Sequence, residues 1–188
     1  MQRREALGLV AVLLGGTIVG ADAFLSGCKT PAKKTGLFAD SDIAFLDEVG
    51  ETILPATSAS PGAKDAKIGE FMKVIVTDCY TPEDQNAFVA GIPKLNEASN
   101  KKFSKDFMDL SAGQKHDLLA DLDKEAKDYD SKKKDEDPRH YFAMMKQLTI
   151  WGYFSSEPGA TKALRWLPVP GKYDGDYPYK KGDKAWAI

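Results

Sequence analysis

The sequence predicts an all-α fold, a bundle of about five helices, that ends in an extended C-terminal strap. Apolar residues recur at helical spacing in several segments, and no segment shows the sustained alternation of a half-buried strand. The tract 165–179 is instead dense in proline, glycine and aromatic residues, which excludes a regular helix. A chain of 188 residues can bury a core of its own, so we expect a single helical domain.

The first two helices are predicted from the spacing of their apolar residues. Within 42–54, one helical face is formed by Ile43, Leu46, Val49 and Ile53, and Pro55 ends the pattern. After a turn-rich link at residues 61–62, a second face is formed by Ile68, Phe71, Met72, Ile75 and Val76.

The later helices are predicted mainly from their start signals. Thr81 can cap a helix that runs to about Asn96, although Gly91 and Pro93 are expected to kink or shorten it. A capping box at 111–114 opens another helix, whose inward-facing residues are Leu118, Leu119 and Leu122. After Pro138, a final long helix is indicated by Phe142, Met145, Leu148 and the apolar run 149–151. We interpret the charged segment 121–137 as a solvated helix end and loop.

The N-terminal segment is typical of a bacterial signal peptide. Arg3 and Arg4 precede an uncharged stretch, 6–21, which is shorter than the roughly 20 residues of the alternative, a membrane-spanning helix. The adjacent arginines partly match a twin-arginine export signal. Residues 25–28, Leu-Ser-Gly-Cys, resemble a lipobox, so Cys28 is the predicted lipid attachment site and first mature residue.

These features predict three parts of the chain. Residues 1–27 are the signal peptide, 28–39 a lipidated flexible tether, and 40–188 the helical domain. We therefore expect a periplasmic protein that a lipid holds on a bacterial membrane.

Composition excludes several functions and offers no site for chemistry. With 26 basic and 28 acidic residues, the formal net charge of -2 argues against nucleic-acid binding. Two cysteines and two histidines are too few for a disulfide framework, a four-cysteine zinc site or haem ligation, and no nucleotide-binding or nucleophile motif occurs. We therefore predict no catalytic, cofactor-binding or metal-binding residue. His116 is expected on the surface, and His140 as a helix cap or partly buried.

Two features remain open to a structural or a partner-binding interpretation. Cys79 follows an apolar helical face, so it is either a small buried residue or a thiol that bridges to a partner chain. The strap either wraps the protein's own bundle or also presents a surface to a partner, because tyrosine, tryptophan and arginine concentrate at interfaces. The predicted interface residues are Tyr153, Phe154, Arg165, Trp166, Tyr173, Tyr177, Tyr179 and Trp186.

Several stretches in order resemble the gluconate 2-dehydrogenase subunit 3 family, also called the gamma chain. They are 45–57, 68–71, 77–85, 152–166, 168–171 and 184–187, and the likeness covers nearly everything from about Asp40 onward. The resemblance implies a non-catalytic small subunit that acts in the export and maturation of a large flavoprotein dehydrogenase of the glucose-methanol-choline type. Cys28 is a feature that not every relative has, and its lipid would add membrane tethering of the complex. It places FAD in that partner and, in many members, haem c in a cytochrome c subunit. A free-standing periplasmic lipoprotein enzyme acting on sugars and a structural envelope lipoprotein are the alternatives.

Overall fold

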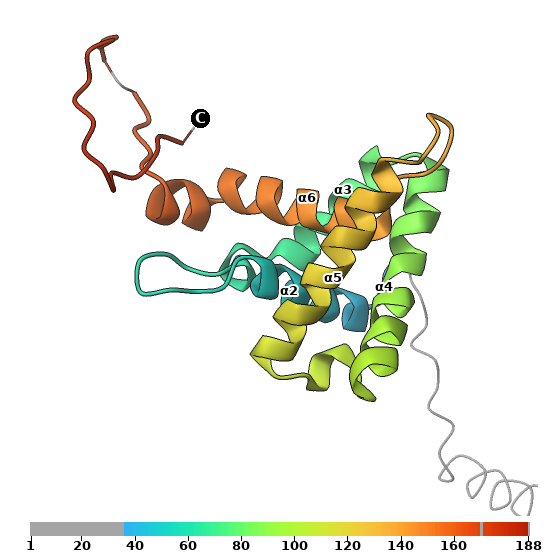
Figure 1. Cartoon of the computed structure of the whole chain (residues 1–188). Helices are drawn as coiled ribbons and strands as arrows, with labels where there is room; N and C mark the ends of the chain where they lie inside the picture. Colours follow the sequence, from blue (N-terminus) through green and yellow to red (C-terminus); the bar gives the residue numbers. More distant parts are fainter. Residues whose placement is uncertain (1–35, 170, 188) are drawn as a thin grey trace, which may run out of the picture. The chain divides into compact units, whose positions relative to one another are not determined.

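A computed structural model describes residues 36–169 and 171–187, which belong to one compact unit. The described residues are helical without a regular strand, as predicted (Figure 1). The α-helices are α2 (Asp40–Ile53), α3 (Ile68–Cys79), α4 (Pro82–Phe103), α5 (Ala112–Asp130) and α6 (Tyr141–Ser155). Three shorter helical segments are η1 (Ala63–Ala66), η2 (Phe107–Asp109) and η3 (Gly159–Ala163). Arg3, Arg4, Cys28 and the predicted signal peptide lie outside the described residues.

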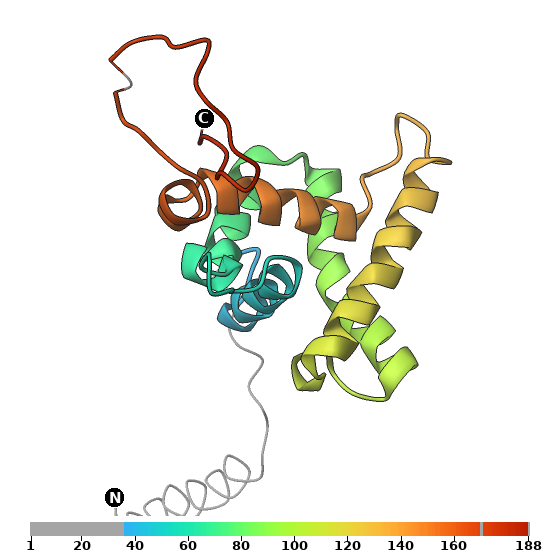
Figure 2. The same ribbon diagram turned by 60° about the vertical axis from the view of Figure 1, so that its left-hand side comes forward.

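Helix α6 contacts α2, α3, α4 and α5. It runs along one side of the bundle, next to the strap (Figure 2). Its first turn meets α4 so closely that a side chain in place of Gly91 would overlap the ring of Tyr141. Near its end, Gly152 leaves room for the ring of Phe71 on α3. Most of the core predicted from helical spacing is confirmed, whereas Ile53, Phe71 and Ile75 are only partly buried. The predicted residues that are buried are Ile43, Leu46, Val49, Ile68, Met72, Val76, Leu118, Leu119, Leu122, Phe142, Met145 and Leu148.

Helix α4 differs from the sequence-based expectation, because it continues to Phe103 instead of ending near Asn96. Pro93 lies inside the helix, where it removes one backbone hydrogen bond. Packing explains why the helix persists, since Phe88, Ile92 and Leu95 are all buried on either side of this position. Gly91 therefore serves the close approach of α6 and does not end the helix.

The predicted helix starts are present. The hydroxyl of Thr81 accepts a hydrogen bond from the amide of Asp84 at 3.3 Å. Ser111 and Gln114 form the capping box of α5, each side chain accepting from the other's amide. His140 caps α6, its Nδ1 accepting from the amide of Phe142 at 3.3 Å, and it is buried. His116 is exposed, as expected.

The expectation that Cys79 is buried is wrong, because its side chain is exposed. Helix α3 ends at this residue, so the apolar face that includes Val76 does not continue through it. The next residue, Tyr80, packs on the core instead, with its ring centroid 6.5 Å from that of Phe88. Cys79 is thus the last residue of α3, and its side chain lies in solvent although the spacing from Val76 predicts the apolar face.

Tyr141 makes the stability of the bundle sensitive to alkaline pH. Burial, with a smaller contribution from the charge of Glu125, raises the pKa of the Tyr141 hydroxyl to about 12. In the unfolded chain the same hydroxyl loses its proton near its ordinary value of 10.0. The neutral Tyr141 hydroxyl therefore makes its full contribution to the free energy of unfolding below pH 10. This contribution is lost as the pH rises through about 12.

We expect a Tyr141→Phe variant to lose less stability than the wild type between pH 9 and pH 11, as measured by denaturant unfolding. Tyr173→Phe is the matched control, because the Tyr173 side chain is exposed and should leave the pH dependence unchanged. Identical pH profiles for the wild type and Tyr141→Phe would contradict the expectation.

Candidate functional site

The short helical segment η3 changes the direction of the chain after the end of α6. The hydroxyl of Ser156 accepts a hydrogen bond from the amide of Gly159 at 3.2 Å, and η3 follows as a single π-helical turn. The alpha carbon of Gly159 lies so close to the carbonyl oxygen of Tyr153 that a side chain has no room there. The chain then becomes extended at Leu164, and residues 164–187, which we call the strap, project away from the helices (Figures 1 and 2).

The strap closes on itself at its base. An isolated parallel bridge joins Arg165 to Trp186, in which the Arg165 amide donates to the Ala185 carbonyl at 3.0 Å. The Ala187 amide donates to the Arg165 carbonyl at 2.8 Å. The ammonium group of Lys184 also donates to the carbonyl of Lys162, next to the start of the strap. The two ends of the strap are therefore held together, although the residues described between them, 166–169 and 171–185, form no regular helix or strand.

Three side chains of the predicted interface meet at this base and form what we call the arginine clamp. The guanidinium carbon of Arg165 lies 4.1 Å from the ring centroid of Trp186 and 5.1 Å from that of Tyr177. The two rings pack edge to face, with centroids 5.6 Å apart. Cation–π contacts of this kind stabilise by about 0.5–2 kcal/mol each. Within the described residues, Arg165 Nε is buried and has no hydrogen-bond acceptor.

The strap does not wrap its own bundle, which corrects one of the two interpretations drawn from the sequence. Tyr173 is 96% exposed, and Tyr179 and Val169 are also largely exposed. The physical reason is that the strap's closing contacts are made within the strap and η3, at the bridge and the arginine clamp. Its aromatic side chains are left facing solvent.

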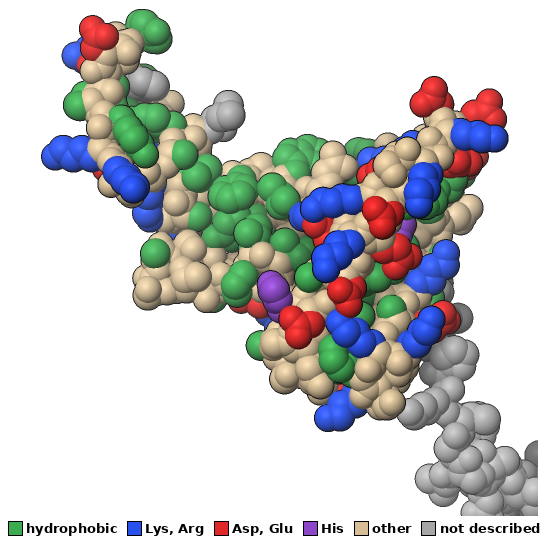
Figure 3. All heavy atoms as spheres, in the orientation of Figure 1, with side chains coloured by type: hydrophobic (Ala, Val, Ile, Leu, Met, Phe, Trp, Pro, Cys, Tyr) green, Lys and Arg blue, Asp and Glu red, His purple; other side chains and the backbone are tan. Residues whose placement is uncertain are grey.

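A second apolar region lies beside the base of the strap, on the last turns of α6. Ile150, Trp151 and Phe154 are exposed there, Trp151 by 54%, and we call them the apolar face. The ring of Trp151 packs edge to face on Phe71 of α3, with centroids 5.3 Å apart. Hydrophobic side chains cover this part of the surface, whereas charged side chains cover α5 (Figure 3). Exposed apolar clusters of this kind mark interaction sites.

Two hollows connect the apolar face with the strap. One, of about 550 Å³, is lined by the apolar face together with Leu164, Ala185 and Trp186. The other, of about 350 Å³, lies within the strap and is lined mainly by Leu167, Tyr173, Tyr177 and Trp186. Because Trp186 lines both, the apolar face and the strap form one continuous region, which we call the docking surface.

Tyr153 does not belong to this surface, which corrects its assignment to the interface. Its side chain is 3% exposed, and its hydroxyl donates to the carbonyl of Pro61. The neighbouring Phe154 does lie on the apolar face. Adjacent helical residues point about 100° apart, so two consecutive aromatic residues face different surroundings.

Ile150, Trp151, Leu167 and Val169 are exposed parts of the docking surface that sequence reasoning missed. A signal for the first two is present in the composition of α6. Lys146 is the single charged residue in Tyr141–Ser155, and a helix that is apolar all round is normally buried. An exposed face on such a helix therefore indicates a missing neighbour.

The described residues offer no metal centre and no membrane span. No group of three histidine, cysteine, aspartate or glutamate side chains that could hold a metal ion occurs within 36–169 and 171–187. None of the helices in this part of the chain is both long and apolar enough to cross a membrane.

An all-α domain that displays an apolar helix face and an aromatic strap is typical of a subunit of a larger assembly. The family described as gluconate 2-dehydrogenase subunit 3 matches residues 40–171, and the chain belongs to this family. The resemblance noted in the sequence is thereby confirmed, and the family is that of a subunit of an oxidoreductase complex. A comparison with curated proteins finds no match, and neither does one with solved structures.

Proposed function

We propose that this chain is a non-catalytic small subunit whose docking surface binds a large flavoprotein dehydrogenase of the glucose-methanol-choline type. FAD and the oxidation of a sugar or sugar acid then belong to the large subunit, and a cytochrome c subunit with haem c can accept the electrons. The observation that carries the proposal is the apolar face of α6, continued by the aromatic strap. Family membership supports a complex of dehydrogenase subunits.

The energetics favour such an interface. Complete burial of a large apolar side chain stabilises a complex by about 1.5–3 kcal/mol. The docking surface exposes several such side chains at once, among them Trp151, Trp166 and Tyr173. The arginine clamp fixes the base of the strap before binding, so less conformational entropy is lost on association.

Export and anchoring form the second part of the proposal, and the sequence of residues 1–28 supports it. Arg3 and Arg4 mark a twin-arginine signal, a route for cargo that folds in the cytoplasm, so one signal serves both subunits. Lipid attached to Cys28 then holds the complex on the periplasmic side of a membrane. A strain that lacks this chain should retain the flavoprotein in the cytoplasm, and Cys28→Ala should abolish labelling by palmitate. Normal periplasmic dehydrogenase activity without this chain would refute the escort role.

The variants Trp166→Ala and Tyr173→Ala test the docking surface. The measurement is the dissociation constant of each variant for the flavoprotein that co-purifies with the affinity-tagged chain. We expect each variant to raise the dissociation constant about tenfold or more, because exposed aromatic residues contribute only once a partner covers them. The melting temperature should change by less than about 2 °C, since neither side chain supports the core.

Met108→Ala is the matched control, because Met108 is an exposed large apolar residue on η2, outside the docking surface. It should leave the dissociation constant unchanged. Equal losses of melting temperature and of binding in the strap variants would show that the strap mainly stabilises its own chain. Equal effects of Met108→Ala and the strap variants would place the interface elsewhere.

A further inference from the structure

The formal net charge of -2 is the balance of regions with opposite sign. The helical body, 40–163, has 16 basic and 23 acidic side chains and a net side-chain charge of -7. The strap has five basic side chains, Arg165, Lys172, Lys180, Lys181 and Lys184, against three acidic ones, which gives +2. The strap is thus a basic segment on an acidic domain.

The basic side chains of the two regions also differ in their partners. In the body, eight of the 16 form ion pairs with carboxylates: Lys64, Lys73, Lys102, Lys115, Lys124, Lys127, Arg139 and Lys146. In the strap, Lys172 is the one basic side chain with a carboxylate partner among the described residues, Asp174 at 3.7 Å. Among the described residues, no carboxylate lies within ion-pair distance of Arg165, Lys180, Lys181 or Lys184. Four of the strap's five cations therefore have no anionic partner in this part of the chain.

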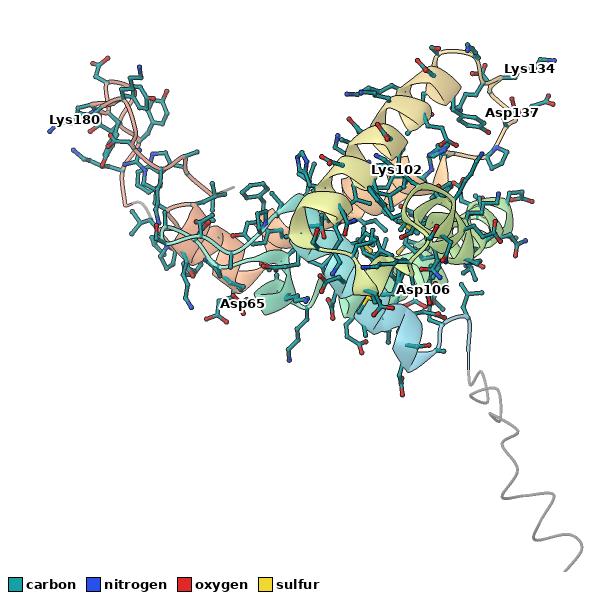
Figure 4. The ribbon with its side chains drawn as sticks, turned by 60° about the horizontal axis from the view of Figure 1, so that its bottom comes forward. Asp65, Lys102, Asp106, Lys134, Asp137 and Lys180 are labelled. Atoms are coloured by element: carbon teal, nitrogen blue, oxygen red, sulfur yellow. The ribbon has the colours of Figure 1, made fainter. Side chains whose placement is uncertain are left out.

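These cations lie on the strap, which is part of the docking surface. Lys180 lies on the strap at one end of the described unit, and Lys134 and Asp137 lie in the α5–α6 loop at the other end (Figure 4). Lys180 and Lys181 directly follow the exposed ring of Tyr179. An approaching acidic surface would be attracted to the strap and repelled by the body, so charge favours one orientation of the encounter.

We infer that the docking site on the large flavoprotein carries acidic side chains, and that the cations of the strap steer the association of the two subunits. The inference rests on the proposed function and adds the chemistry of the partner surface. The cations of the strap without carboxylates are the groups that an acidic partner would complement. The hollows beside the strap favour a protein, whose protruding side chains can fill them, over a flat lipid surface.

The test measures the association rate of the purified full-length chain with the co-purifying flavoprotein, from about 20 to about 200 mM NaCl. We expect the rate for the wild type to fall about tenfold over this range, because salt screens steering. The double variant Lys180→Glu/Lys181→Glu should associate at least tenfold more slowly at low salt. The matched control, Lys133→Glu/Lys134→Glu, makes the same charge change in the α5–α6 loop and should stay within about twofold of the wild type.

The outcomes separate this inference from the proposed function. Formation of the complex at a rate that neither salt nor Lys180→Glu/Lys181→Glu changes would overturn the inference and leave the proposed function standing. The same holds if this double variant binds the flavoprotein normally but has lost a wild-type affinity for phosphatidylglycerol vesicles, because the cations would then serve an anionic membrane. Absence of any binding to the flavoprotein by the wild type would overturn both.

Discussion

Replacing Glu48 with alanine is expected to lower the free energy of unfolding by about 3 kcal/mol. Glu48 on α2 forms an ion pair with Lys115 on α5, at 2.7 Å between Oε1 and Nζ, and a second with Lys64. The side chains of Glu48 and Lys115 are only 18% and 11% exposed. Without the carboxylate, the ammonium group of Lys115 stays largely buried beside the ring of Phe107, with its nearby anion removed. Denaturant unfolding measures the loss.

The same ion pairs make the stability of the domain sensitive to acid. Burial, the largest effect, raises the pKa of Glu48, but the combined contacts with Lys115 and Lys64 outweigh it and hold the pKa below its ordinary 4.5. Because the pKa is lower in the folded state, this stabilisation is present above about pH 4.5 and is lost as the pH falls through the lowered value. The stability difference between the wild type and Glu48→Gln should therefore shrink between pH 7 and pH 3.

Two further variants test whether the stability lost in Glu48→Ala comes from the unpaired, buried charge of Lys115. Lys64→Ala should cost less than about 1 kcal/mol, because the Lys64 side chain is 49% exposed and pairs largely in water. The double variant Glu48→Leu/Lys115→Met removes both buried charges and should recover most of the stability lost in Glu48→Ala. If Lys64→Ala proves as costly as Glu48→Ala, the buried Lys115 is not the cause.

Local sequence patterns were sufficient to predict the fold, whereas the Glu48–Lys115 pair could not be read from them. Spacing and capping signals such as Ser111 with Gln114 act within a few residues of each other, so they are visible in any window of the chain. Glu48 and Lys115 are 67 positions apart and meet only because α2 and α5 pack together. The persistence of α4 through Pro93 likewise depends on tertiary packing, which overrides local propensity.

The candidate site shows the same division between local and long-range information. Composition predicted an irregular aromatic strap, and the structure has one. Composition could not decide whether the strap covers the bundle, because that depends on which rings Arg165 reaches, and Trp186 is 21 residues away. The shortage of charge in α6 was visible, but only the packing of the other helices shows which side of α6 they leave open.

Gly159→Ala is expected to have the largest effect on binding, with the dissociation constant for the flavoprotein raised by about a hundredfold or more. A β-carbon at this position would overlap the carbonyl oxygen of Tyr153. That atom belongs to the backbone of α6, so no change of side-chain rotamer can relieve the overlap, and η3 must move. The amide of Leu164 donates to the carbonyl of Gly159 at 2.9 Å, so the start of the strap must move with η3.

The displaced strap would no longer adjoin the apolar face, and the hollow that Leu164, Trp186 and Phe154 line together would be lost. The bundle itself should lose only about 1–3 kcal/mol, a typical cost of overpacking. Gly113→Ala on α5 is the matched control, because no described residue beyond its own helical turn places an atom within 4 Å of the added β-carbon. This variant should keep wild-type binding and gain up to about 1 kcal/mol of stability. Wild-type affinity in Gly159→Ala would show that docking does not require the strap and the apolar face to be held in one arrangement.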